Sequence, residues 1–185
     1  MTEQPTLKSK RLVLRPFTLS DAQDVQRLAG AEEVADTTLN VPHPYADGQA
    51  EAWIESHDYA FRQRERVALA ITDSDGALVG AVSLRLELAH GRAELGYWIG
   101  LPYWGCGYAT EAASTMVGYG FSELGLNRIH AHHLARNPAS GRVLEKAGFT
   151  HEGFHRAHIL KNGRFEDIHL FAVLRAEYDR AVGTS

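Results

Sequence analysis

Two glycines, Gly105 and Gly107, stand one residue apart between a strand-like run and a helical one. The run before them, residues 92–100, has the pattern of a strand, and apolar side chains recur at helical spacing from Ala109 to Leu124. Free backbone N–H groups at the start of a helix attract anions, and glycine lets a phosphate approach the backbone closely. The order of strand, glycine loop and helix therefore predicts either an anion site or a plain tight turn.

The rest of the chain divides into strands and helices by its periodicity and its turn signals. A short helix is expected after the cap Asn137 and Pro138, and Asp47 is expected to cap a longer one. Asn162-Gly163 predicts a tight hairpin. With no repeat, linker or low-complexity segment, the 185 residues are expected to form one α/β domain. The patterns predict strands at 11–17, 67–72, 78–86, 92–100, 127–134 and two within 151–174, with helices at 19–30, 47–64, 109–124 and 137–148.

Composition limits the classes of function. The 19 basic and 23 acidic residues give a net charge of −4, whereas a general nucleic-acid binder usually carries a basic excess, so no nucleic-acid partner is expected. No run of about 18 apolar residues occurs, so no membrane span is expected. The first residues lack the apolar core of a secretory signal, and the single cysteine, Cys106, allows no disulfide within the chain. These features predict a cytoplasmic protein.

Two familiar phosphate-binding motifs fail at the glycine loop. Gly100 and Gly105 have the spacing of the P-loop glycines, but Cys106 and Gly107 follow where that motif needs lysine and then serine or threonine. Gly105 and Gly107 also begin a dinucleotide fingerprint, but Thr110 occupies the place of the third glycine. The strand patterns before the loop indicate an antiparallel meander and not the βαβ unit that a dinucleotide site requires.

A third interpretation comes from resemblance. The runs "AELGYWIGLPYWGCGYATEA" and "ARNPASGRVLEKAGF" resemble the acetyl-CoA-binding core of the GNAT family of N-acetyltransferases, in the branch of the ribosomal-protein N-terminal acetyltransferases and their relatives. The similarity extends over about residues 11–174 of the single domain 1–185 and is sharpest from 93 to 149. It implies an α+β fold with a mixed, mostly antiparallel sheet of six to seven strands flanked by helices. CoA is then expected at a splay between two central strands.

The resemblance implies which residues hold CoA, as the donor of the acetyl group. The family's loop pattern, Gln/Arg-x-x-Gly-x-Gly/Ala, falls on Trp104, Gly107 and Ala109. Trp104 replaces the usual Gln or Arg, which costs little if backbone amides bind the pyrophosphate. Cys106 stands where the branch often has lysine, so we expect weaker CoA affinity without loss of function. The implied CoA contacts are Trp98, Ile99, Trp104, Gly105, Cys106, Gly107, Tyr108, Ala109, Thr110, Asn137 and Ser140.

The resemblance also implies that the acetyl group passes directly from acetyl-CoA to an amine. Glu94 is the candidate base that takes the proton from the amine, directly or through a water; the alternative is a solvent-facing strand carboxylate. Ser140 is the candidate donor of a proton to the CoA thiolate; the alternative is an ordinary serine in the first turn of a helix. Many family members use a tyrosine one helical turn later, where this chain has Leu144.

Neither the clustered histidines nor the cysteine changes this interpretation. His130, His132 and His133 suggest a metal site, but no carboxylate or cysteine stands at ligand spacing, so no metal is expected. Cys106 is not expected to carry the acyl group, because nothing near it in the sequence would activate a thiolate.

No motif fixes the acceptor amine. At pH 7 an α-amino group, with a pKa of about 8, is neutral far more often than a lysine, with a pKa of about 10.4, and only the neutral amine attacks. The branch resemblance also favours a protein or peptide N-terminus, with residues 36–47 and the hairpin at Asn162 facing it. The alternatives are a small-molecule amine (an antibiotic, polyamine or amino acid), a non-catalytic acyl-CoA sensor and a nucleotide-phosphate binder. A homodimer is compatible with the resemblance.

Overall fold

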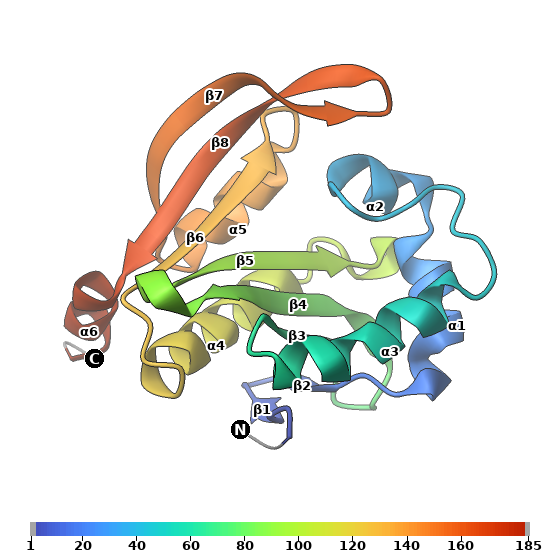
Figure 1. The fold of residues 1–185 in the computed structure, drawn as a ribbon, viewed down its shortest axis with the longest axis horizontal. Coiled ribbons are helices and arrows are strands. Elements are labelled where there is room, and N and C mark those ends of the chain that lie inside the picture. The colour runs from blue at the N-terminus through green and yellow to red at the C-terminus, as the bar shows by residue number, and fades with distance from the viewer. Residues whose placement is uncertain (1–2, 184–185) are drawn as a thin grey trace.

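An eight-stranded sheet in the order β1-β2-β3-β4-β5-β6-β8-β7 runs through the computed structural model, which describes residues 3–183 (Figure 1). Neighbouring strands are antiparallel except β5 and β6, which are parallel. The strand beyond the expected six or seven is β1, too short to leave a periodic signal. The strands are β1 (Leu7–Lys8), β2 (Val13–Pro16), β3 (Arg66–Thr72), β4 (Leu78–Glu87), β5 (Arg92–Ile99), β6 (Arg128–Leu134), β7 (Thr150–Lys161) and β8 (Arg164–Leu174).

Helices cover both faces of the sheet. α1 and α3 pack on one face, against β3, β4 and β5, while α4 and α5 pack on the other, against β4, β5 and β6. The sequence patterns missed α2 and α6, which are short and polar. The helices are α1 (Ala22–Ala29), α2 (Glu32–Thr37), α3 (Gln49–Arg62), α4 (Tyr108–Ser122), α5 (Pro138–Lys146) and α6 (Arg175–Gly183). Within residues 3–183, none of them is long and apolar enough to cross a membrane.

Each face has its own apolar core. On the α4 side, Met116 and Phe121 are fully buried in one cluster with Leu84 and Ile129 of the sheet. On the α1 and α3 side, the second cluster includes small residues of β3 and β4 together with Trp98 of β5. Small side chains on this face let the two helices approach the sheet closely. The sheet is therefore held rigidly between two layers.

Local signals placed two of three predicted boundaries correctly. The Asn137 side chain accepts a hydrogen bond from the Ser140 N–H and caps α5. Asn162 and Gly163 form the two-residue turn between β7 and β8, with φ of 50° and 76°. Asp47 does not cap α3, because its carboxylate accepts instead from Gln26 Nε2 at 2.9 Å, and the helix begins after Gly48. Gln26 and Asp47 are far apart along the chain, so no local sequence pattern predicts their contact.

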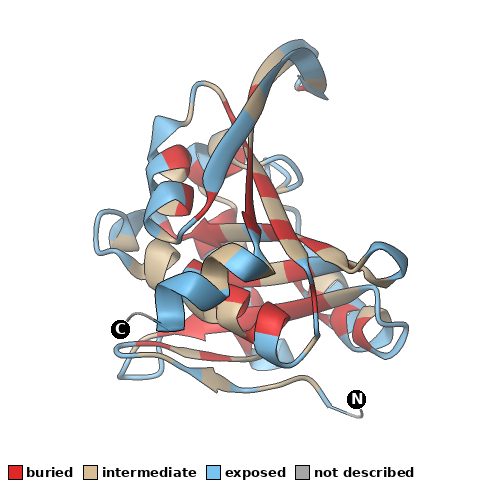
Figure 2. Cartoon of the chain, turned by 90° about the vertical axis from the view of Figure 1, so that its left-hand side faces the viewer, coloured by how far each residue is buried: buried red, intermediate tan, exposed pale blue. Residues whose placement is uncertain are grey.

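The sheet opens between β5 and β6. The parallel pairing runs only from Arg92–Arg128 to Glu94–His130, and beyond it the two strands diverge (Figure 1). The far half of the sheet, β6 with β7 and β8, turns away, and the β7–β8 hairpin projects with most of β7 exposed (Figure 2). The expected splay between central strands is confirmed.

Candidate functional site: two cavities that meet at the splayed strands

The glycine loop has the backbone that its sequence suggests. Gly105 and Gly107 both lie in the left-handed region, with φ of 78° and 81°, and Gly107 immediately precedes α4. L-residues with a side chain rarely adopt this conformation, which explains both glycines. A Cβ at Gly105 would meet nothing within 4 Å, so the loop surface there is open. An open loop at the start of a 15-residue helix fits an anionic group such as a pyrophosphate.

Two side chains hold this loop from behind. Trp104 turns back so that its indole Nε1 donates to the Ile99 carbonyl at 2.7 Å. Arg11, from the β1–β2 turn, donates to the Cys106 carbonyl at 3.0 Å and pairs with Glu111 of α4 at 2.8 Å. Trp104 thus anchors the loop, while the backbone is left to bind a ligand. Arg11 was missed by the sequence analysis because its contact is almost a hundred residues away along the chain.

A cavity of about 470 Å³ lies between the glycine loop, the start of α4 and α5, and we call it the loop cavity. Every residue predicted to contact CoA lines it except Cys106, which is exposed. Arg142 and Lys146 of α5 also line it and were not predicted. Their positive charges suit the phosphates of CoA. The predicted residues lining the cavity are Trp98, Ile99, Trp104, Gly105, Gly107, Tyr108, Ala109, Thr110, Asn137 and Ser140.

A second cavity, of about 700 Å³, lies on the opposite face of the sheet, over β3 to β6 and under α1, α3 and residues 37–42; we call it the sheet cavity. The two cavities share lining residues, because the strands are parted there. The shared residues are Thr37, Thr38, Tyr97, Trp98 and Ser140. A group bound in one cavity can therefore reach a group bound in the other through the splay.

Tyr97 and Ser140 form a hydroxyl pair at this junction. Their hydroxyl oxygens lie 2.7 Å apart, and the Tyr97 hydroxyl also lies 3.2 Å from the Ser140 carbonyl oxygen. Burial raises the pKa of Tyr97 to about 12, with the hydrogen bond from Ser140 acting the other way. Tyr97 therefore keeps its proton at neutral pH and can donate to Ser140, whose own hydroxyl hydrogen is then free to point into the cavity. Tyr97 was not among the site residues that the sequence predicted.

Glu94 lies on the sheet-cavity side of β5. The β4–β5 pairing has no register shift, so Glu94 shares its face with Gly96 and Trp98. Its side chain is 17% exposed, pairs with Arg85 and lies 3.1 Å from His132 Nδ1. The hydrogen bond from His132, followed by that from Arg85, lowers the pKa of Glu94 to about 2 against the effect of burial. Glu94 is thus a half-buried, paired carboxylate with little affinity for a proton.

His132 is the group that this carboxylate orients. When Nδ1 carries the proton and donates it to Glu94, Nε2 keeps a free lone pair. His132 is part of the sheet-cavity wall together with Glu94 and Ser140. His133 is arranged differently, since its Nδ1 lies 2.8 Å from the Leu134 carbonyl oxygen, and it packs beside α5. Across residues 3–183, no group of three His, Cys, Asp or Glu residues is placed to hold a metal ion.

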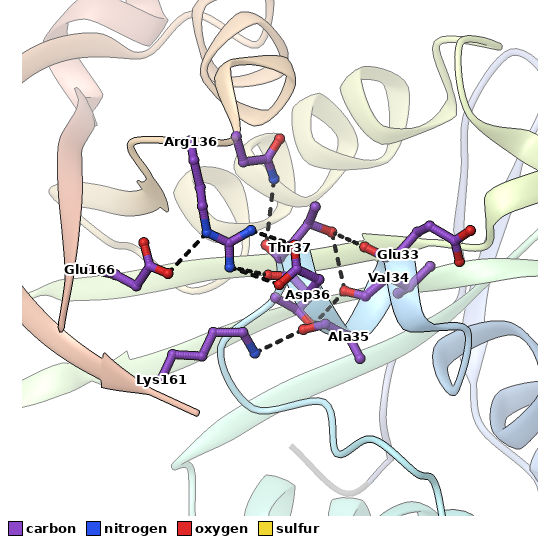
Figure 3. Close-up of polar contacts among 10 residues, drawn as sticks. Glu33, Val34, Ala35, Asp36, Thr37, Arg136, Lys161 and Glu166 are labelled. Carbon is purple, nitrogen blue, oxygen red and sulfur yellow. Dashed lines mark hydrogen bonds and ion pairs between the residues drawn. The ribbon is translucent and has the colours of Figure 1, made fainter. Parts of the chain in front are cut away.

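Residues around the end of α2 are tied to both β6 and the projecting hairpin (Figure 3). Arg136, which follows β6, pairs with Asp36 and with Glu166 of β8. Lys161, at the end of β7, donates to the Ala35 carbonyl at 2.9 Å. Asn137 also donates to the Thr37 carbonyl, at 3.5 Å. The end of α2 is therefore fixed beside the junction, where Thr37 lines both cavities. Arg136 links Asp36, in one region predicted to face the acceptor, to Glu166 on the hairpin that forms the other.

Comparisons with known proteins agree with this geometry. Residues 11–150 match the family described as acetyltransferase (GNAT) domain. The "Uncharacterized N-acetyltransferase p20" of Bacillus licheniformis is 32% identical over 94% of this chain and 98% of its own length. The "Putative ribosomal N-acetyltransferase YdaF" of Bacillus subtilis (strain 168) is 36% identical over 57% of this chain and 58% of its own.

Solved structures share the fold. A GNAT-family acetyltransferase from Bacillus anthracis superposes with a TM-score of 0.82 at 24% identity, covering 92% of this chain and 98% of the other. The spermidine N-acetyltransferase from Vibrio cholerae, solved in complex with CoA and spermine, gives a TM-score of 0.79 at 23% identity, covering 92% and 99%. At this level of sequence identity, the structural similarity shows a shared fold.

Proposed function

The chain belongs to the GNAT acetyltransferase family and is an acetyl-CoA-dependent N-acetyltransferase, and we propose that its acceptor is the α-amine of a protein or peptide N-terminus. The observation that carries the proposal is the meeting of the two cavities at Tyr97 and Ser140, with the Glu94–His132 pair on the acceptor side. Acetyl-CoA occupies the loop cavity, and the amine enters from the sheet cavity.

The loop cavity suits the acetyl donor. Its backbone at Gly105 is open toward an anion, and Arg142 and Lys146 of α5 supply positive charge to the same cavity. The pyrophosphate belongs at the start of α4, where the helix dipole favours negative charge. The acyl end then extends toward the splay, beside Ser140.

His132 takes the proton from the attacking amine in this proposal. Its Nε2 is the free acceptor once Nδ1–H is held by Glu94, and correctly placed general bases contribute about 10² to 10⁴ in rate. Glu94 acts through His132 as a positioning residue and stabilises the imidazolium that forms, because its low pKa keeps it ionised. This is the role that we now assign to the carboxylate that the sequence suggested as the base.

Ser140 gives a proton to the departing thiolate. When Tyr97 is the donor in its contact with Ser140 Oγ, the hydroxyl of Ser140 donates to the sulfur, so the leaving group is stabilised as its bond breaks. Tyr97 fills the part that many family members give to the tyrosine replaced here by Leu144, which lies fully buried in the core.

Two considerations favour an α-amine. An α-amine is neutral at pH 7 far more often than a lysine amine, so a single imidazole suffices to complete its deprotonation. Similarity to YdaF, whose name refers to ribosomal acetylation, points in the same direction. The alternative is a small-molecule amine, and the likeness to the spermidine enzyme makes a polyamine the first such candidate to test.

CoA release from acetyl-CoA tests the proposal directly. The purified protein is assayed with peptides that have a free N-terminus and no lysine, with N-terminally blocked lysine peptides, with polyamines and with aminoglycosides. Release with the first group well above the rate without amine supports the α-amine, and the product's mass locates the acetyl group. Release with only another group overturns the α-amine assignment. Silence throughout, with acetyl-CoA binding retained in calorimetry, would favour a sensor.

A further inference from the structure

We infer that the peptide acetylated by this enzyme carries an aspartate or glutamate at its second or third residue, and that Arg66 binds that carboxylate. The inference rests on the proposed function, since it assumes an N-terminal α-amine in the sheet cavity. It names a specificity determinant that lies on β3, two strands away from Glu94.

The charges that line the sheet cavity are unequal. Arg66 and Arg85 both line it, whereas Glu94 is its one carboxylate among the residues that the structure describes. Glu94 is already shared between Arg85 and His132. The cavity therefore has an excess of positive charge, and an anionic acceptor fits it better than a cationic one.

Arg66 is the cation left without a partner. From residue 3 to residue 183, no carboxylate lies within ion-pair distance of Arg66 and its guanidinium makes no hydrogen bond, although the residue is only half-exposed. Glu65 and Glu87 line a neighbouring hollow with Arg66 and Arg85, but Glu87 is paired with Arg92. A guanidinium has five fixed donors that match a carboxylate, so an unpaired one on a cavity wall is a ready anion site.

His57 is a second indication that the sheet cavity is positively charged near Arg66. It is 3% exposed, lines the sheet cavity, and neither of its ring nitrogens has a hydrogen-bond partner among the described residues. Burial and then the charge of Arg66 lower the pKa of His57 to about 4. Arg66 is thus close enough to His57 for its positive charge to act on this end of the cavity.

Strand register sets the distance between the amine and the carboxylate. Arg66 lies opposite Arg85, and Arg85 lies opposite Glu94, so Arg66 and Glu94 are two strand spacings apart, or about 10 Å between Cα atoms. An extended peptide advances about 3.3–3.6 Å per residue. For an amine held at the Glu94 side of the Glu94–His132 pair, the side chain of residue two or three of a peptide that runs across β4 toward β3 therefore lies near Arg66. A free amino acid, whose carboxylate is next to its amine, does not span this gap.

A set of matched peptides tests the inference. Tripeptides with serine first and aspartate, asparagine or lysine at the second or third position are compared by kcat/KM, together with free aspartate and spermidine. We expect the aspartate peptides to exceed the asparagine peptides about tenfold or more, mainly through KM, because a charged hydrogen bond in a shielded site is strong. Arg66→Gln should bring that ratio close to one, and Arg66→Glu should make the lysine peptides the better substrates.

Arg62→Gln is the control. Arg62 is exposed on α3 and pairs with Asp58, so the preference for aspartate should persist in this variant. Equal rates for aspartate and asparagine peptides, or a preference that survives Arg66→Gln, would overturn the inference while leaving the α-amine proposal intact. Better turnover of free aspartate than of any peptide would also overturn it. If no peptide is acetylated but spermidine is, both proposals fail together.

Discussion

The hydroxyl oxygens of Tyr97 and Ser140 lie 2.7 Å apart at the point where the two cavities meet, one on β5 and the other in the first turn of α5. Because β5 and β6 part just before this point, a strand residue and a helix residue from the two sides of the splay face each other directly. The pair is thus positioned to serve the leaving group of a transfer between the cavities.

Removing either hydroxyl should slow the chemistry without weakening donor binding. Ser140→Ala and Tyr97→Phe are each expected to lower kcat about 10- to 100-fold while the KM for acetyl-CoA changes little, because the hydroxyls act on the thiolate as it forms. The double variant should be little slower than Ser140→Ala alone, since the two act in series. Ser122→Ala, exposed at the end of α4, is the control. A rise in KM with unchanged kcat would assign the pair to binding instead.

The Glu94–His132 pair should behave as one unit. His132→Ala is expected to lower kcat/KM about 10²- to 10³-fold, and Glu94→Gln about tenfold, since the amide no longer stabilises the imidazolium. The two losses should not add in the double variant. Exposed His90 provides the matched control, His90→Ala. Full activity in His132→Ala would return the role of base to Glu94 or to a water.

The pH dependence distinguishes these roles. The pKa of Glu94 is about 2, so its carboxylate stays ionised over the whole range in which the enzyme is assayed. Loss of kcat/KM on acidification to about pH 5 should therefore come from another group, so the loss should remain in Glu94→Gln, with its midpoint moved to lower pH because the supporting carboxylate is gone. Disappearance of the acidic loss in the pH profile of Glu94→Gln would contradict the assignment and make Glu94 the base.

His57 should make stability depend on pH. Its folded pKa, about 4, is below its ordinary value of 6.5, so the unfolded chain binds the proton more readily in between. Its contribution to the free energy of unfolding is complete above pH 6.5. That contribution falls by up to about 3 kcal/mol as the pH drops through this window to about 4. Urea unfolding at several pH values measures this. His57→Leu should flatten the slope and His90→Leu should not. Parallel slopes for all three proteins would rule the effect out.

Alanine substitutions at two glycines of similar backbone conformation, one inside and one outside the glycine loop, test the loop as the anion site. Gly105→Ala forces a left-handed alanine, at a cost of about 1–2 kcal/mol, into the loop that binds the pyrophosphate. The loop should relax, and acetyl-CoA affinity should fall about tenfold by calorimetry. Gly76 in the β3–β4 turn has a similar φ of 85° and equally open space, so Gly76→Ala should cost similar stability without changing affinity. Equal affinities in both variants would argue against the loop as the anion site.

The sequence predicted what depends on neighbours along the chain. The glycine loop, the Asn137 cap and the Asn162-Gly163 turn each follow from a few consecutive residues. The partners of Glu94 do not, because His132 approaches it only through the parallel pairing of β5 with β6. Arg66 was missed for the same reason, since its position relative to Glu94 is a product of strand register. The roles of Glu94 and Ser140 in the reaction remain predictions.

The short pairing of β5 with β6 means that this sheet has two edges inside the molecule as well as two outside. Past Glu94 and His130, the backbone N–H and C=O groups that face the gap pair with no other strand among residues 3–183. Such an edge is a template for any extended chain that carries amides. The arm of the acetyl donor contains amide groups, which can thus hydrogen-bond to the facing edges of β5 and β6 as a strand would. The bound donor would then link the two halves of the sheet.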